Sequence, residues 1–385
     1  MSSIVSDLNG AAIGGTESII KNDGLKHNGL IREEAAVAEN GQQNSTGNIN
    51  STTGTTQSAV ATSSRETNST QPLNIISTFS GVGGIDEAFR QACYKILKAI
   101  ELDRYPAMVY NRNFELPAIV DDIRHVDPND LPRAAGIAGG SPCQDYSVAG
   151  LRQGFSNARG LLIFEPLRLA EVLQPKFILI ENVKGLVTHD KGRTLATIIE
   201  RYESKGYKVV YKVLNAKDFG VPQNRERVYI VMFKDIEHYN RFKFPEPLKR
   251  KPSLNDVIDF EHPVEDKYYY TASKNRKIYE MLAAAIDDPN AVYQLRRTYV
   301  RKNKSGLIPT LTANMGTGGN NVPIIKTKYG IRKLTPRECF NAMGFPKDFI
   351  LPEDLSDSRL YKMAGNSVCV PVVRRIAENI AQAIS

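Results

Sequence analysis

An α/β fold with a Rossmann-like, mostly parallel sheet and helices on both faces is predicted by three features of the 385-residue sequence. Short β-rich apolar runs alternate with helical stretches between residues 73 and 243, and such alternation implies a parallel sheet covered by helices. The first run ends in a glycine cluster that opens a helical stretch. Beyond Phe244 the alternation stops, which predicts a second, smaller domain.

The strand candidates follow one another in a regular order. The first, residues 74–79, is followed by a helical stretch and by a second strand in "KAIELD". Ligands of such sheets bind at the carboxyl ends of the strands, so we expect the site there. The remaining expected elements are strands at 135–140, 176–183, 207–216 and 227–233 and helices at 161–173, 194–205 and 370–384.

The N-terminal segment has a different composition. Residues 1–72 contain no Phe, Tyr or Trp, and residues 40–71 consist mainly of Ser, Thr, Asn, Gly and Gln. Such a segment buries too little apolar surface to offset its ordering entropy, so we expect it to be disordered. The expected divisions are a tail at 1–72, a catalytic domain at 73–243, a second domain at 244–345 and a C-terminal return to the first domain at 346–385.

The charge of the chain is uneven. The formal net charge is +8, and residues 290–333 contain nine Lys or Arg and no Asp or Glu. This basic segment favours a polyanionic partner, although a solvated surface would have the same composition. No apolar run approaches the roughly 20 residues of a membrane helix, and no signal peptide is evident. We therefore expect an intracellular protein without membrane contact.

A lone cysteine lies at a predicted strand end. Cys143 follows the strand at 135–140 in the turn "GGSPCQ", and a thiolate is a strong nucleophile. A buried structural thiol is the alternative. The four cysteines form no CxxC pair, and a zinc deaminase site is disfavoured because position 146 is Tyr and no Glu lies two residues after His125. We expect no metal.

The glycine cluster suits a nucleotide-like ligand. Gly81, Gly83 and Gly84 permit close backbone approach, and Glu101 at the end of the next strand could accept both hydroxyls of a ribose. The spacing differs from GxGxxG, so a ligand with a ribose and no phosphates fits as well. A tight packing turn would also explain the glycines.

Three charged residues also lie at predicted strand ends or entries. Glu181 ends the apolar strand "FILIENV", where burial could raise its pKa and let it act as an acid. Arg225 and Arg227 alternate at the entry to another strand, so both could point to one face. Individually, each could be an ordinary surface or salt-bridging residue.

Six motifs in one order carry a family resemblance. "FSGVGG", "SPCQ", "ENV", "QNRERVYIV", "RKLTPRECFNAMGFP" and "YKMAGNSVCVPVV" across residues 75–373 closely resemble those of cytosine-5 DNA methyltransferases. The resemblance implies that Cys143 adds to C6 of a target cytosine and that Glu181 contacts ring N3. It also implies that Arg225 and Arg227 orient and stabilise the activated ring.

The resemblance implies S-adenosylmethionine as methyl donor, with S-adenosylhomocysteine as product. "VDD" stands where the family often has Gly-Asp, which leaves Asp121 and Asp122 as alternatives for one contact. The expected cofactor-binding residues are Phe79, Ser80, Gly81, Gly83, Gly84, Ile85, Glu101, Asp122, Ile123, Pro142, Asn366 and Val368.

The partner that the resemblance implies is double-stranded DNA, from which the target base must be flipped out. We expect residues 144–160 to close behind that base, a monomeric enzyme, and a cognate restriction endonuclease if the chain belongs to a restriction-modification pair. In a prokaryote the protein would be cytoplasmic and nucleoid-associated. The expected DNA contacts are Ser147, Arg152, Gln153, Arg296, Arg297, Thr312, Asn314, Gly318 and Gly319.

Two other functions fit parts of the sequence. A tRNA cytosine methyltransferase of similar architecture usually carries a Cys-Phe-Thr element in its recognition region, whereas residues 234–338 contain no cysteine. A non-catalytic DNA-binding regulator descended from the enzyme would lack Cys143 or Glu181, and both are present. DNA methylation is therefore the expected function.

Overall fold

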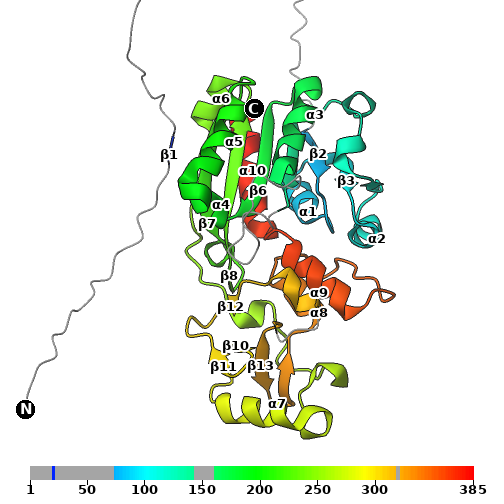
Figure 1. Ribbon diagram of the computed structural model, residues 1–385, viewed down its shortest axis with the longest axis vertical. Helices are drawn as coiled ribbons and strands as arrows, with labels where there is room; N and C mark the ends of the chain where they lie inside the picture. Colours follow the sequence, from blue (N-terminus) through cyan, green and yellow to red (C-terminus); the bar gives the residue numbers. More distant parts are fainter. Residues whose placement is uncertain (1–19, 22–72, 143–159, 318–320) are drawn as a thin grey trace, which may run out of the picture. The chain divides into compact units, whose positions relative to one another are not determined.

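The central feature of the fold is an eight-stranded sheet with the order β1-β7-β9-β6-β5-β2-β3-β4 (Figure 1). The computed structural model describes residues 20–21, 73–142, 160–317 and 321–385, and structural statements concern these residues. The strands of the sheet are β1 (Ile20–Lys21), β2 (Asn74–Thr78), β3 (Lys95–Glu101), β4 (Ile119–Val120), β5 (Gly136–Gly140), β6 (Phe177–Val183), β7 (Lys208–Asn215) and β9 (Glu226–Phe233).

The sheet is mostly parallel, as predicted, but it contains antiparallel pairings. β4, β3, β2, β5 and β6 pair in parallel, whereas β9 pairs antiparallel with both β6 and β7. Residues 216–225 are the whole connection from β7 to β9, and a parallel crossover needs a dozen residues or more. The short connection therefore accounts for the reversed direction of β9.

Part of the segment predicted to be disordered forms a strand. β1 pairs antiparallel with β7, with Ile20 opposite Tyr211 and Lys21 opposite Val210. The rest of residues 1–72 lies outside the described residues.

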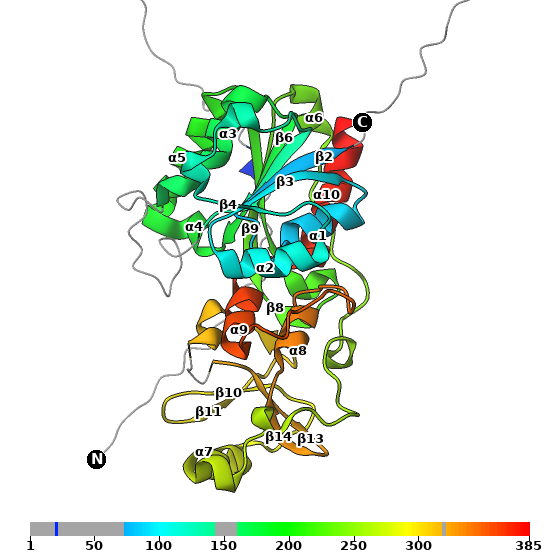
Figure 2. The ribbon, with the colours of Figure 1, turned by 90° about the vertical axis from the view of Figure 1, so that its right-hand side faces the viewer.

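Alternate residues of the strands face opposite helical layers. In β6, Phe177 and Leu179 belong to the core that α1 and α10 cover, whereas Ile178 and Ile180 belong to the core under α3 and α5. Figure 2 shows these two helix pairs on opposite sides of the sheet. The helices around the sheet are α1 (Gly84–Gln91), α2 (Arg104–Asn113), α3 (Glu165–Leu173), α4 (Gly185–Thr188), α5 (Arg193–Glu203), α6 (Ile236–Arg241) and α10 (Val370–Ile384).

A smaller antiparallel sheet is built from the chain after residue 290. Its order is β11-β10-β13-β14, and with α7 it encloses a separate core that includes Leu282, Tyr293 and Ile324. A two-stranded parallel pair, β8 with β12, joins residues 223–224 to residues 308–309. The bounds are α7 (Ala272–Ala285), β8 (Gln223–Asn224), β10 (Tyr293–Leu295), β11 (Val300–Lys302), β12 (Ile308–Pro309), β13 (Ile324–Thr327), β14 (Gly330–Lys333), α8 (Pro336–Asn341) and α9 (Asp357–Asn366).

No helix within the described ranges is long and apolar enough to cross a membrane.

A buried carboxyl group lies at the first turn of α1. The fully buried side chain of Asp86 accepts hydrogen bonds from Ser77 Oγ (2.8 Å) and Tyr110 OH (3.0 Å). Burial raises its pKa from 3.8 to about 6. The folded state therefore prefers the protonated acid, and the associated stability is present below pH 3.8 and is lost as the pH rises through 6.

We expect Asp86→Asn to remove this pH dependence. Between pH 5 and pH 8 the wild type should lose about 1.4 kcal/mol of unfolding free energy that the variant does not lose. Urea unfolding of both proteins at the two pH values measures the change in unfolding free energy of each. Titration of groups that both proteins share contributes equally and cancels in the comparison. An equal loss in both proteins would contradict the raised pKa.

Candidate active site

The carboxyl ends of β5 and β6 lie side by side at one edge of the large sheet. Gly140 of β5 is paired with Glu181 of β6, and Asn182 Nδ2 donates to Ser141 Oγ over 2.9 Å. The chain that leads into the predicted nucleophile is thereby fixed to the strand that carries the predicted acid. Pro142 is the last described residue before Cys143, which lies outside the described residues together with Ser147, Arg152 and Gln153.

The carboxyl group of Glu181 is buried and incompletely bonded. Arg227 Nε lies 3.2 Å from Glu181 Oε1, an ion pair that draws β9 and β6 together. Within the described part of the chain, Oε1 has no hydrogen-bond partner. Burial raises the pKa of Glu181, and the nearby Arg227 and Arg225 oppose that rise. A buried carboxyl group with a raised pKa can donate a proton or a hydrogen bond to a ligand.

The two arginines of "QNRER" have different surroundings. Arg227 lies beside Glu181 and donates from Nη1 to the carbonyl of Glu226 (2.7 Å). Arg225 is only 3% exposed, and its guanidinium donates to three backbone carbonyls, those of Leu311 (2.8 Å), Gly365 (3.1 Å) and Ser367 (2.6 Å). Burial lowers its pKa to about 10, so the group stays charged at neutral pH.

The glycine turn after β2 has the shape of a ligand cradle. Phe79 and Gly81 both have positive φ (53° and 57°), and such backbone is uncommon for a residue as bulky as Phe. A Cβ atom at Gly81 would meet nothing within 4 Å, so the turn is open at that point. Glu101 lies against this turn: its Oε2 accepts from Gly81 N (2.8 Å) and its Oε1 from Asp103 N (2.7 Å).

The other predicted residues of this turn are enclosed by the protein. The Ser80 hydroxyl bonds to Ser77 Oγ (3.0 Å) and to the carbonyl of Ile100 (3.2 Å). Gly83 has φ 91°, and Ile85 is buried. Ser80 and Ile85 therefore support the turn from the protein interior.

The end of β4 lies beside Glu101, because Glu101 is paired with Val120. Asp122 caps the short helix that starts at the buried Ile123, and Arg124 Nε donates to its carboxylate (3.0 Å), which lowers its pKa to about 2. Asp121 donates from its backbone N–H to the carbonyl of Glu101 (3.2 Å). Both acids thus lie near the ribose-binding candidate.

The C-terminal motif returns to the glycine turn. A Cβ atom at Gly84 would lie 2.5 Å from Ser367 Oγ and 3.1 Å from Val368 Cγ2, so only glycine allows this contact. The other methyl group of Val368 lies 4.0 Å from the Cβ position of Gly140. The buried Val368 therefore lies between the turn after β2 and the end of β5, and the exposed Asn366 ends α9.

Four of the nine predicted DNA contacts fall within the described residues. Arg297, Thr312 and Asn314 are exposed, whereas Arg296 is half-buried and donates from Nη2 to Gln294 (3.1 Å). Gly318 and Gly319 lie outside the described residues.

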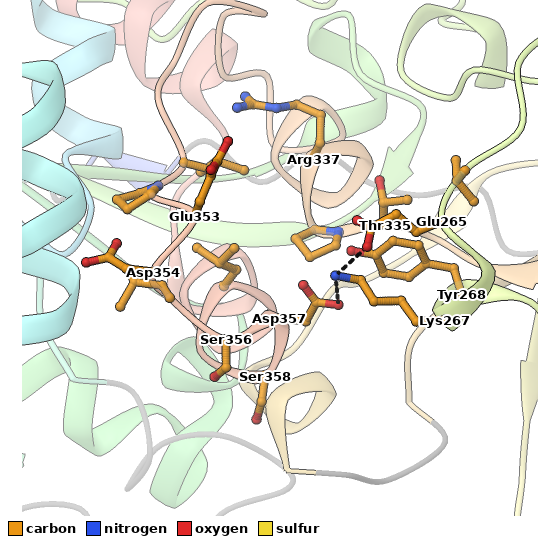
Figure 3. A pocket seen from close by; sticks show the side chains of 16 residues that line it. Glu265, Lys267, Tyr268, Thr335, Arg337, Glu353, Asp354, Ser356, Asp357 and Ser358 are labelled. Carbon is orange, nitrogen blue, oxygen red and sulfur yellow. Dashed lines mark ion pairs between the residues drawn. The ribbon is translucent and has the colours of Figure 1, made fainter.

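A cavity of about 1140 Å³ lies elsewhere (Figure 3). It is lined by the segment around Lys267, the start of α8 and the segment before α9, and Lys267 pairs there with Glu265 (3.2 Å) and Asp357 (3.5 Å). None of the predicted site residues that the structure describes lines it. Among the residues that the structure describes, no group of three or more His, Cys, Asp or Glu is placed to hold a metal ion.

Two amides near the site were not predicted from the sequence. Asn182 holds Ser141, and the fully buried Gln223 accepts from Leu311 N (3.1 Å) and donates to the carbonyl of Ala342 (2.7 Å). Both belong to quoted motifs, Asn182 to "ENV" and Gln223 to "QNRERVYIV", and this membership is the signal that the sequence offers for them.

Known proteins resemble this chain over most of its length. Residues 73–382 match the family model for C-5 cytosine-specific DNA methylase. The Type II methyltransferase M.Bsp6I of Bacillus sp. (strain RFL6) is 53% identical over 311 residues, which cover 80% of this chain and 98% of the relative. The Type II methyltransferase M.NlaX of Neisseria lactamica is 36% identical over 319 residues, covering 81% and 97%.

Solved structures share the fold. The methyltransferase EhMeth of Entamoeba histolytica matches with a TM-score of 0.62 at 16% identity over 82% of this chain and 99% of its own. A putative DNA modification methyltransferase encoded within a prophage of E. coli matches with a TM-score of 0.62 at 21% identity, covering 81% and 99%. The chain belongs to the C-5 cytosine-specific DNA methylase family and is a DNA cytosine-5 methyltransferase that uses S-adenosylmethionine.

Proposed function

We propose that the enzyme methylates a cytosine flipped out of duplex DNA and that Cys143 attacks C6 of that base. The observation that carries this proposal is the pairing of Gly140 with Glu181, because the buried acid lies beside the end of β5 and Cys143 is three residues after Gly140 in the sequence. None of the three thiols that the structure describes is suited to this role: Cys339 and Cys369 are buried, and Cys93 follows α1.

Methyl transfer to C5 requires that this carbon first become nucleophilic. Addition of the Cys143 thiolate to C6 moves the C5–C6 electron pair toward C5 and N3, which makes C5 nucleophilic. S-adenosylmethionine, when bound, supplies an electrophilic methyl group for C5. Loss of the C5 proton to a base then returns the electron pair to the ring, and the C6–S bond breaks to release the thiolate.

Glu181 is suited to assist the addition step. Negative charge that develops on the ring collects at N3, and a protonated carboxyl group can donate to that atom. The raised pKa of Glu181 and its burial at the end of β6 support this role. Arg227, 3.2 Å from the same oxygen, holds the carboxyl group in place and adds positive charge beside the ring.

The cofactor is proposed to bind along the turn after β2. The open space above Gly81, the carboxylate of Glu101 and the return of Val368 to Gly84 and Gly140 fit a ligand with an adenosine and an amino-acid part. Phe79 would contact the adenine, Glu101 the ribose, and Asp122 or Asp121 the edge of the base. Pro142 and Asn366 would close the side toward the nucleophile.

We also propose which regions of the chain carry out catalysis and which recognise DNA. We assign residues 73–243 and 346–385 to catalysis and cofactor binding, and residues 244–345 to target recognition. Double-stranded DNA is the substrate of the family, and the restriction-modification relatives support a cognate endonuclease as partner. We propose that the enzyme acts as a monomer.

Neutralising Arg296 and Arg297 together tests the recognition region. If both contact phosphates, Arg296→Gln with Arg297→Gln should weaken binding to every duplex and reduce the slope of log K against log salt by about 2. The matched control is Arg276→Gln with Lys277→Gln on the exposed face of α7, which removes the same charge. Fluorescence anisotropy between 50 and 200 mM salt measures the slope for both double variants. An equal change of slope in the two would contradict phosphate contacts by Arg296 and Arg297.

Bisulfite sequencing tests the proposed function directly. DNA from cells that express the protein should carry 5-methylcytosine at one short sequence, and DNA from cells that express Cys143→Ser should not. Methylation confined to tRNA would instead support the RNA-modifying alternative.

A further inference from the structure

The guanidinium of Arg225 joins two segments that lie far apart in the sequence. Three of its five N–H donors are directed to carbonyl oxygens, one in the segment proposed to read DNA and two in the segment proposed to hold the cofactor. Its Nε atom is buried and has no partner among the described residues. This arrangement differs from that of Arg227, which points at Glu181.

The first arm of Arg225 fixes the start of the recognition segment. Nη1 donates to the carbonyl of Leu311 (2.8 Å), and the N–H of the same residue donates to Gln223 Oε1 (3.1 Å). Both backbone groups of Leu311 are therefore held by side chains from the "QNR" segment. The next residue, Thr312, is exposed and starts the turn that carries Asn314.

The second arm fixes the wall of the proposed cofactor pocket. Nη2 donates to the carbonyls of Gly365 (3.1 Å) and Ser367 (2.6 Å), which flank Asn366. Ser367 and Val368 in turn lie against Gly84, where a Cβ atom would come within 2.5 and 3.1 Å of them. Arg225 thus binds the same segment through which the end of α9 meets the glycine turn.

Between the two arms, α9 lies directly against the recognition turn. A Cβ atom at Gly365 would lie 2.1 Å from the carbonyl carbon of Thr312 and 2.4 Å from Ala313 N. A Cβ atom at Gly316 would lie 2.2 Å from the carbonyl oxygen of Ser358. Backbone therefore meets backbone at both places, and the recognition turn and α9 are in direct contact.

We propose that Arg225 is a positioning residue that couples DNA recognition to cofactor binding, rather than a group that acts on the cytosine ring. A ligand that orders residues 312–314 also orders residues 365–367. The second ligand then binds with a smaller loss of conformational entropy, because these residues are already ordered. The proposal rests on the proposed function, which assigns DNA to the first segment and the cofactor to the second.

A planar guanidinium is required for this role. Lysine keeps the charge, but a single ammonium on a flexible stem does not reproduce a fork that reaches carbonyls in two segments. Arg225→Lys should therefore weaken the coupling between the two ligands more than it weakens either binding step alone.

The test is a thermodynamic cycle. Calorimetry measures the Kd of S-adenosylhomocysteine for the free enzyme and for its complex with a 20-base-pair duplex that carries the site found by bisulfite sequencing. In the wild type we expect the product to bind the complex at least about tenfold more tightly than the free enzyme. For Arg225→Lys the ratio should fall to within about twofold of one.

The matched control is Arg332→Lys. Arg332 is also fully buried and bonds to Glu338 (2.7 Å) and to the carbonyl of Asp259 (3.0 Å). It belongs to the proposed recognition region but lies outside residues 312–314 and 365–367, so its variant can change the affinity for DNA but should keep the wild-type ratio of the two Kd values. If Arg225→Lys does not fold, Gly365→Ala replaces it, because its methyl group would push Thr312 away from α9 and lower the ratio in the same way.

Three outcomes would overturn the proposal. The first is a wild-type ratio of the two Kd values (free enzyme over DNA complex) below about two. The second is a folded Arg225→Lys variant that keeps the wild-type ratio. The third is an Arg332→Lys variant whose ratio falls as far as that of Arg225→Lys. Failure of S-adenosylhomocysteine to bind the wild type in either state would also remove the proposed cofactor site. Binding without coupling would leave that site intact and refute the role of Arg225 alone.

Discussion

Methyl transfer by Cys143→Ser is expected to fall by about four orders of magnitude or more. A serine hydroxyl has almost no anionic form near neutral pH, so it does not add to C6 at a useful rate, and C5 without that addition is a poor nucleophile. Single-turnover transfer of a labelled methyl group from S-adenosylmethionine to a duplex that contains the target site measures the loss.

Cys93→Ser is the matched control for this substitution. Cys93 is an exposed cysteine that follows α1 and lies outside the proposed site, so its variant should transfer methyl groups within about twofold of the wild-type rate. A rate for Cys143→Ser above one hundredth of the wild type, in protein that still binds the duplex, would exclude Cys143 as the nucleophile.

Glu181→Gln is expected to lower the single-turnover rate by about 10²- to 10⁴-fold. Glutamine keeps the size of the side chain and can donate a hydrogen bond, but it does not transfer a proton to N3. Because burial raises the pKa of Glu181, the protonated form persists at higher pH than for an ordinary glutamate. The wild-type rate should therefore fall as the pH rises through that pKa, and the variant should lack this decline.

Glu226→Gln serves as the control. Glu226 is on β9 next to Arg227, is exposed, and pairs with Lys184 over 3.0 Å. Its variant should keep both the rate and the pH dependence of the wild type. If Glu181→Gln keeps the wild-type decline with pH, the group that titrates is another residue, and the assignment of Glu181 as the acid is wrong.

The sheet and its functional edge were predictable because their signals are local. Apolar runs with turn residues between them identify strands, and parallel strands place their carboxyl ends together, so Glu181 and the turn that carries Cys143 were expected at the same edge of the sheet. The pairing of Gly140 with Glu181 agrees with that expectation. The fold class was predicted correctly for this reason, and the family was predicted correctly from the order of its six motifs.

The contacts made by individual side chains were not predictable, because they depend on residues distant in the sequence. The carbonyls that Arg225 binds belong to residues 311, 365 and 367, far along the chain, and no local pattern links them to an arginine at a strand entry. The same holds for Gly84, whose need for glycine arises from Ser367 and Val368. Direction was missed too: the reversal of β9 depends on the length of a connection rather than on the apolar pattern of the strand.

Trapping on 5-fluorocytosine tests the covalent mechanism most directly. Fluorine at C5 of the target base does not leave as a proton does, so after methyl transfer the C6–S bond stays intact. With S-adenosylmethionine, the wild type should form a protein–DNA adduct that survives denaturation, and peptide mapping should place it on Cys143. Cys143→Ser should bind the same duplex without forming the adduct. An adduct that forms with Cys143→Ser, or that maps to Cys93, Cys339 or Cys369, would contradict the proposed active site.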